Sequence, residues 1–204
     1  MNINKRVIEQ LEQLVSKGPE ETEAVVLDST QQQGYIVGVM AEAEGLSMAE
    51  GLSMAEGFSH AEGLRVSLAL ADYDRYSVAL RNLQVAYYKD SPQNGDKVEA
   101  YLRQRAEQIT QRVTYLEEPL ELLELDAEAG LAQLRSRAPQ QEGEERVYWE
   151  AMLQARPHPT VSLTRYRWTP DGSEREPFVY PITFVTLGRI AQDLAESLIA
   201  VSQK

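Results

Sequence analysis

The sequence predicts an α+β fold in which antiparallel sheet carries helices on one face. Apolar residues recur at steps of three and four in residues 3–17, 96–116 and 188–201, which predicts three amphipathic helices. Short apolar runs divided by polar turns lie between these segments and are typical of antiparallel strands. The resulting order is helix, four strands, helix, four or five strands, helix. This order predicts the internal duplication of a helix–four-strand unit.

The first predicted helix, residues 3–17, ends where Gly18 and Pro19 interrupt the helical pattern. A hairpin is expected next, because the β-branched run 23–28 and the apolar run 35–40 flank a polar, glutamine-rich turn. The first half then ends with two further antiparallel strands, a short one and a longer return strand, at residues 66–71 and 76–88.

The helix predicted at residues 96–116 is expected to be the element around which the two halves are arranged. Gly95 breaks the chain before it and Pro119 ends it. The second half repeats the order of the first, with strands expected at residues 120–126 and 130–134, from Arg146, at 160–163 and at 178–186, and with a polar loop at 138–145.

Two units follow from this reading. Residues 1–95 form the first helix–four-strand unit, with a hexapeptide-repeat insertion at 45–62. Residues 96–204 form the central helix, the second strand unit and the C-terminal helix. The alternative is one continuous domain that contains both units.

The insertion repeats one hexapeptide, Gly-Leu-Ser-Met-Ala-Glu, at residues 45–50 and 51–56, and a related one at 57–62. Six helical steps of about 100° advance by about 240°, so equivalent residues would point in different directions on a helix. On a strand they stay on one face. The period therefore favours an extended hairpin arm, whereas the propensities of Ala, Glu, Leu and Met favour a helix. A tolerated loop insertion without a role of its own is the third reading.

The net charge of −12 is unevenly distributed along the chain. No Lys or Arg occurs between Lys17 and Arg65, a stretch that contains nine acidic residues. Such a segment repels phosphate backbones and anionic lipids, so neither a nucleic acid nor a membrane is expected as a partner. It is either a solvated surface or a docking surface for a basic protein. In the second case the partner-binding residues are Glu44, Glu50, Glu56 and Glu62.

Catalytic, metal and cofactor motifs are missing from the sequence. It has no cysteine, no phosphate-binding glycine loop and no serine nucleophile motif. Its two histidines, His60 and His158, are far apart in the chain, and each is expected to be exposed or partly packed. Asp72 and Asp74 could together hold a hard cation, but a solvated turn is favoured. We therefore expect no cofactor and no metal, and an enzyme is the less favoured of the two readings.

Two other clusters of polar residues have a structural and a functional reading. Adjacent carboxylates such as Glu117 and Glu118 would need burial in a cleft to act as acid and base. Arginines alternate with aromatics in residues 165–168, which could stack bases on a sheet. On an acidic protein, cross-strand packing with solvated arginines is favoured instead.

The sequence thus favours an acidic, cytoplasmic protein-interaction module, an adaptor, assembly factor or chaperone-like protein, without catalytic chemistry. It contains neither a long apolar segment nor a signal peptide pattern. A sheet face that helices leave uncovered would suit a partner or a second copy, so a homodimer is expected as well. The alternative is a small-molecule-binding protein or enzyme with a pocket between sheet and helices, where Asp126, Arg146 or His158 would converge.

Overall fold

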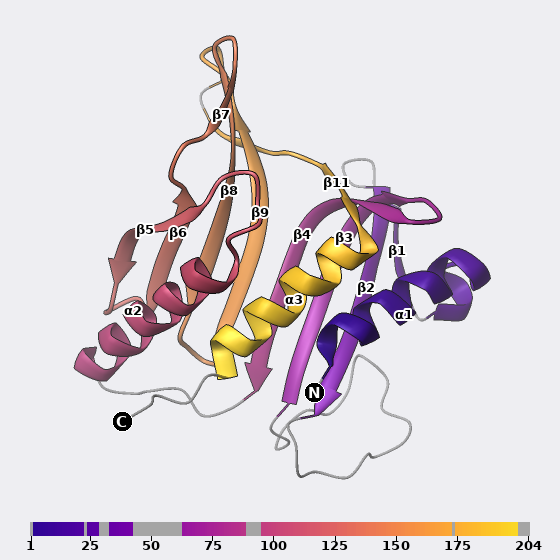
Figure 1. The fold of residues 1–204 in the computed structure, drawn as a ribbon, viewed down its shortest axis with the longest axis horizontal. Coiled ribbons are helices and arrows are strands. Elements are labelled where there is room, and N and C mark those ends of the chain that lie inside the picture. Colours follow the sequence, from indigo (N-terminus) through magenta and orange to yellow (C-terminus); the bar gives the residue numbers. More distant parts are fainter. Residues whose placement is uncertain are drawn as a thin grey trace.

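The computed structural model describes residues 2–22, 24–28, 33–42, 63–88, 95–172 and 174–199. These residues form three α-helices and one large antiparallel sheet (Figure 1). The helices are α1 (Ile3–Lys17), α2 (Gly95–Arg112) and α3 (Phe184–Ile199). The strands are β1 (Val25–Asp28), β2 (Gln33–Glu42), β3 (Gly63–Tyr73), β4 (Ser77–Tyr88), β5 (Leu120–Asp126), β6 (Leu131–Ser136), β7 (Gln140–Glu142), β8 (Glu145–Gln154), β9 (Thr160–Trp168), β10 (Glu176–Pro177) and β11 (Tyr180–Thr183).

The sheet joins the two halves of the chain into one structure. Its main path runs β1-β2-β3-β4-β9-β8-β6-β5, so the strands of each half follow chain order from an outer edge to the centre. The halves meet where β4 pairs with β9, with Leu83 opposite Leu163 and Val85 opposite Val161. Strands β7, β10 and β11 pair with β8, β9 and β4 beside this path. The arrangement is compatible with a duplicated unit, and duplication itself stays a prediction.

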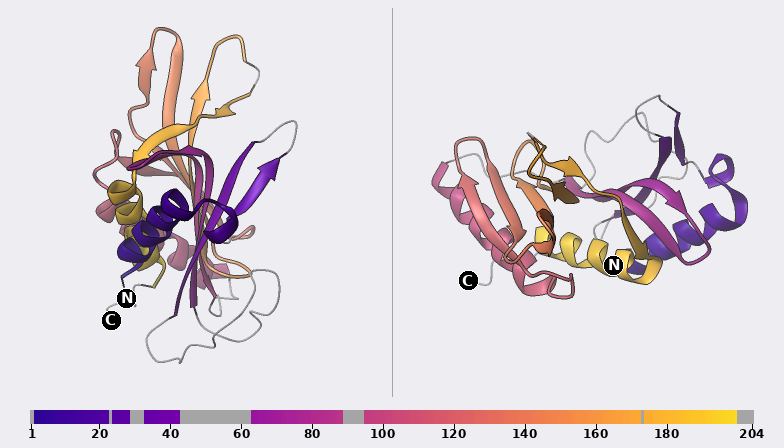
Figure 2. Two further views of the ribbon diagram at one scale, coloured as in Figure 1. Left: turned by 90° about the vertical axis from the view of Figure 1, so that its right-hand side faces the viewer. Right: turned by 90° about the horizontal axis from the view of Figure 1, so that it is seen from above.

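All three helices lie on the same side of the sheet (Figure 2, left). The strands alternate accordingly, so that in β3 Leu64, Val66 and Leu68 are buried while the residues between them are half-buried. The buried strand residues and the apolar faces of the helices form a single core. The predicted α+β fold, with antiparallel sheet and helices on one face, is confirmed.

Helix α1 forms where the sequence predicts it. The Asn2 side chain accepts a hydrogen bond from the Lys5 amide at 2.9 Å and caps the helix. Gly18 follows the last turn with φ of +83°, in the left-handed region that favours glycine, and its amide donates to the Leu14 carbonyl. The buried stripe consists of Ile3, Val7, Leu11 and Leu14.

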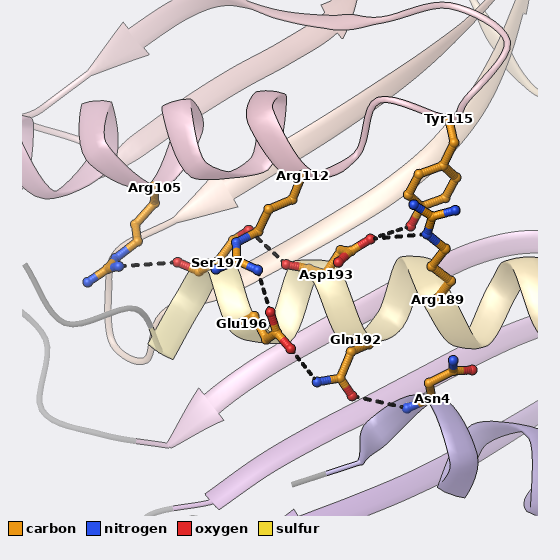
Figure 3. A network of polar contacts seen from close by, with 9 residues as sticks. All are labelled: Asn4, Arg105, Arg112, Tyr115, Arg189, Gln192, Asp193, Glu196 and Ser197. Carbon is orange, nitrogen blue, oxygen red and sulfur yellow. Dashed lines mark hydrogen bonds and ion pairs between the residues drawn. The ribbon is translucent and has the colours of Figure 1, made fainter.

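Helix α3, not the helix at 96–116, is the element that ties the layer of helices together (Figure 3). It packs against both α1 and α2. On the α2 side, Arg112 pairs with Glu196. On the α1 side, Gln192 donates to Glu196 at 2.7 Å and accepts the Asn4 amide at 3.2 Å. One ion pair and two hydrogen bonds thus connect α2 through α3 to the first turn of α1.

Two predicted boundaries around α3 are wrong. Residues 178–186 were expected to be a strand and the last helix to begin at residue 188, but the strand β11 ends at Thr183 and α3 begins at Phe184. The Thr183 hydroxyl accepts the Thr186 amide at 3.2 Å and caps the helix. Phe184, Leu187 and Ala191 are buried at helical spacing, so packing overrides the strand propensity of the Phe-Val-Thr run.

Other differences are smaller. Helix α2 ends at Arg112, so Tyr115 lies in the following loop, where its hydroxyl donates to Asp193 at 2.7 Å. The predicted loop 138–145 contains the short strand β7.

The hexapeptide array at 45–62, and with it the arm predicted there, lies outside the described residues. In the described ranges, no helix is both long and apolar enough to cross a membrane.

Candidate functional site

A groove lies between α1 on one side and the β3–β4 turn with the start of α3 on the other. Its volume is about 540 Å³. That volume falls within the range of about 300–1,000 Å³ that is typical of ligand pockets. Its walls are formed by Ile8, Glu12, Val15, Arg75, Tyr76, Thr183, Phe184 and Val185.

The α1 wall is a second stripe on a helix whose first stripe faces the core. Ile8, Glu12 and Val15 follow one another at steps of four and three, so they share one face. Ile8 and Val15 are half-buried, next to the fully buried stripe. Helix α1 therefore presents two apolar side chains and one carboxylate to the groove.

The opposite wall begins at the β3–β4 turn, which Asp74 fixes. The Asp74 carboxylate accepts the amides of Tyr76 and Ser77, both at 2.7 Å, and the Ser77 hydroxyl at 2.6 Å. These bonds, that of the Ser77 hydroxyl above all, lower the pKa of Asp74. The Tyr76 carbonyl accepts the Phe184 amide at 3.1 Å. The backbone of Tyr76 is thus held from both sides, although 66% of the residue's surface is exposed.

The first turn of α3 completes this wall. Phe184 is buried in the core, whereas its neighbour Val185 is 66% exposed and turns toward the groove. The difference follows from helical geometry, since successive residues lie about 100° apart. Tyr76 and Val185 come from segments more than one hundred residues apart in the chain.

The groove contains two of the large apolar side chains that the core leaves exposed. Four large apolar residues are exposed in the described ranges: Tyr76 and Val185 at 66%, Leu123 at 51% and Val179 at 36%. The two most exposed of them line this one groove. Single exposed apolar residues are ordinary on protein surfaces, but a group of them in a concavity is typical of a binding site.

Charge differs between the two walls. A second cavity of about 380 Å³ adjoins the groove along α1, shares Ile8 and Glu12 with it and includes Lys5 and Glu9. Glu9 pairs with Lys5 at 3.4 Å, while no ion pair joins Glu12 to another described residue. On the opposite wall, the Arg75 guanidinium lies over the Tyr76 ring at 5.2 Å. The α1 wall therefore carries one carboxylate without an ion pair among the described residues, Glu12, and the opposite wall carries the cation Arg75.

The uncovered face of the sheet offers less apolar surface than the sequence suggested. Along β3, β4 and β9, the residues that alternate with the buried ones are mostly small or polar, among them Ser67, Ala69, Gln84, Ser162 and Thr164. Asn82 and Thr164 bond across the join between the halves at 2.8 Å. The homodimer expected through this face stays a prediction.

A buried ion cluster lies between β9 and the segment that joins α2 to β5. Arg165 is only 2% exposed and pairs with Glu117 at 2.9 Å and with Glu118 at 3.2 Å. Its guanidinium also lies over the rings of Trp149 and Tyr180 at 5.2 and 4.7 Å. Burial raises the pKa of Glu118, and Arg165 acts against that shift. The solvated arginine expected at residue 165 is therefore wrong.

A second cluster lies on the uncovered face of the sheet. Glu150, whose side chain is 3% exposed, accepts hydrogen bonds from Gln133 at 2.6 Å, from Arg135 at 3.0 Å and from Arg175. Arg135 and Arg175 lie over the rings of Tyr148 and Tyr166. The carboxylate of Glu150 thus joins β6 and β8 to the segment before β10.

The remaining sequence candidates do not form a site together. Asp126 and His158 lie at one end of the second half of the sheet, while Arg146 begins β8 at the other end, and all three are exposed. Asp72 and Asp74 accept amides of their own turn. In the parts of the chain that are described, no three potential ligand residues group closely enough to hold a metal ion.

The predicted partner-binding residues Glu44, Glu50, Glu56 and Glu62 lie outside the described residues, as does His60. Sequence reasoning did not find Tyr76 and Val185. Tyr76 was read as the first residue of an alternating strand, and Val185 as part of the strand at 178–186. The only signal in the sequence was the second apolar stripe of α1.

Comparison of the chain with protein-family models, with curated proteins and with solved structures found no match.

Proposed function

We propose that this chain is a protein-interaction module that binds a basic segment of another protein in the groove between α1 and the start of α3. One observation carries the proposal. The two most exposed large apolar side chains of the described residues, Tyr76 and Val185, line one groove opposite the Glu12 carboxylate of α1.

The energetics favour a partner over a vacant groove. Complete burial of a side chain the size of Val or Phe is worth about 1.5–3 kcal/mol. Tyr76 and Val185 contribute little of this in the free chain because most of their surface meets water. A bound apolar segment would also cover Ile8 and Val15, which are already half-buried.

A fixed wall makes this binding less costly. The backbone bonds of Asp74, Tyr76 and Phe184 hold the turn against the first turn of α3. Preorganisation of this kind reduces the conformational entropy that association must overcome. Glu44, Glu50, Glu56 and Glu62 belong to the same proposal, because their charges would attract a basic partner to this half of the chain.

The test is quantitative capture of partners from a lysate, followed by mass spectrometry, with a matched set of variants. Tyr76→Ser and Val185→Ser remove the apolar side chains of the groove. Leu123→Ser, which changes an exposed leucine on the edge strand β5, is the control for lost surface hydrophobicity.

We expect a set of proteins whose recovery falls about tenfold in both groove variants and stays unchanged in Leu123→Ser. Equal recovery in all variants would contradict the proposal, whatever is captured. Deletion of residues 45–62 separates the role of the hexapeptide glutamates from that of the groove. Unchanged recovery after this deletion would remove those glutamates from the proposal.

A further inference from the structure

We infer that the segment bound in the groove is an amphipathic helix with its basic residues directed toward α1. This inference rests on the proposed function and adds the conformation and the charge pattern of the partner segment.

Strand pairing at β4 argues against the main alternative to a helix. Extended peptides gain affinity when they add to an open strand edge. At this groove β4 is already paired on one side with β3, and its Ser77–Leu80 segment pairs on the other side with β11. The walls therefore consist of side chains on α1, on a closed turn and on the first turn of α3. A helix satisfies its own backbone hydrogen bonds and needs only side-chain contacts from such walls.

The length of the concave surface fits a helix of several turns. The groove and the adjoining cavity together follow α1 from Asn2 to Val15. At 1.5 Å per residue this distance is about 20 Å, which corresponds to a partner helix of about 13 residues. A helix of that length presents apolar side chains at steps of three and four, matching the spacing of Ile8 and Val15.

The charges set the orientation of the bound helix about its axis. Glu12 is the carboxylate of the α1 wall that has no ion pair among the described residues, because Glu9 pairs with Lys5 on the same wall, whereas Arg75 lies on the opposite wall. Lys or Arg on the partner would therefore face α1, with apolar residues against Tyr76 and Val185. A second copy of this chain fits poorly as the occupant, because a net charge of −12 opposes self-association.

Selection from a displayed library of 14-residue amphipathic helices tests this inference. The library fixes apolar residues at steps of three and four and varies the flanking positions among Lys, Glu, Gln and Ala. It is sorted against the full chain, and clones that bind Tyr76→Ser equally well are discarded. We expect the remaining pool to be enriched in Lys on the side of the helix facing α1.

Charge reversal at Glu12 should reverse the charge preference of the selected peptides, which a purely structural role of Glu12 would not do. In Glu12→Lys, the selected Lys peptides should bind about fivefold more weakly, and a new selection should enrich Glu at the same positions. Glu124→Lys on the edge strand β5 is the matched control for net charge and should leave the selected peptides unaffected.

Three outcomes would overturn the inference: a pool enriched in Glu, a pool without charge preference, or no pool that depends on Tyr76. The first two leave the proposed function intact if the lysate partners still depend on Tyr76 and Val185. Loss of that dependence in the lysate experiment is the separate failure of the proposed function.

Discussion

The two halves of the sheet share one strand order but fill their interiors differently. In the first half, the buried residues of β3 and β4 are all apolar. In the second half, Arg165 and Glu118 are buried in the interior as well, and Glu150 is buried on the uncovered face of the sheet. A common topology therefore leaves the chemistry of the buried residues open.

The cover differs visibly between the halves. Helices α1 and α3 pack against β2 and β4 of the first half, and α2 packs against β5, β6 and β8 of the second, while the ends of β8 and β9 reach beyond all helices (Figure 1). In the second half Trp149 and Tyr180 pack edge to face at 5.1 Å, and Arg165 lies over both rings. Aromatic rings and paired charges thus extend the apolar core there.

Arg165→Met should give the largest effect in the second half. The substitution removes the cation beside Glu118, which then stays buried without its charged partner. Removal of one partner of a buried ion pair costs about 3–5 kcal/mol of unfolding free energy. Urea denaturation of the variant and the parent measures the loss.

The double variant Arg165→Met/Glu118→Gln is the control for this prediction. Because it removes both charges, it should regain part of the loss, and the two substitutions should be non-additive. A loss below about 1 kcal/mol in the single variant would mean that the cluster is solvated rather than buried.

Leu68→Ala is the corresponding test in the first half, where the buried residues of β3 and β4 are apolar. Leu68 is fully buried in β3, so the deletion removes its contacts and leaves a cavity. We expect a loss of about 3 kcal/mol in the same denaturation experiment. The loss should be the same at pH 5 and pH 8, since only apolar groups are involved. A pH-dependent loss would contradict the contrast between the halves.

Gly188→Ala probes the place where α3 meets α1. A Cβ atom at Gly188 would lie 2.3 Å from Asn4 Oδ1 and 2.9 Å from the Asn4 carbonyl oxygen. Alanine ordinarily favours a helix by about 1 kcal/mol over glycine. Here we expect a net loss of about 1–3 kcal/mol, because the backbone of α1 must move away. Asn4→Ala on the Gly188→Ala background should recover only the side-chain part, and a stabilised single variant would disprove the close contact.

Sequence patterns predicted the elements whose cause is local. Periodic apolar residues, Gly18 and the polar turns placed α1 and the first four strands close to their observed bounds. The patterns failed where distant contacts decide. Burial of Phe184 in the core keeps the Phe-Val-Thr run helical, although strand propensity alone contradicts it. The Thr183 cap of α3 is a local signal that the prediction overlooked.

The candidate site could not be predicted from the sequence, because contacts between residues distant in the chain form it. Tyr76 and Val185 meet only because β11 pairs with β4 and carries the start of α3 to the β3–β4 turn. Likewise, Glu117 and Glu118 were visible as a pair, but their partner Arg165 lies 47 residues after Glu118. Pairing across such distances leaves no periodic signal in one sequence.

The smallest expected difference between the halves is in how the unfolding free energy depends on pH. Glu118, a buried carboxyl group of the second half, should cause it. Burial raises its pKa in the folded chain above the ordinary glutamate value, with Arg165 acting against the shift. A group with a raised folded pKa stabilises most below its unfolded pKa, and this contribution is lost as pH rises through the folded value. The unfolding free energy of the parent relative to Glu118→Gln should therefore fall from pH 4 toward neutrality. Urea denaturation across that range measures it, and Glu121→Gln on β5 controls for the change in net charge. A difference that rises with pH would mean that Arg165 outweighs burial, and the second half would then hold its carboxylate as a stabilising ion pair.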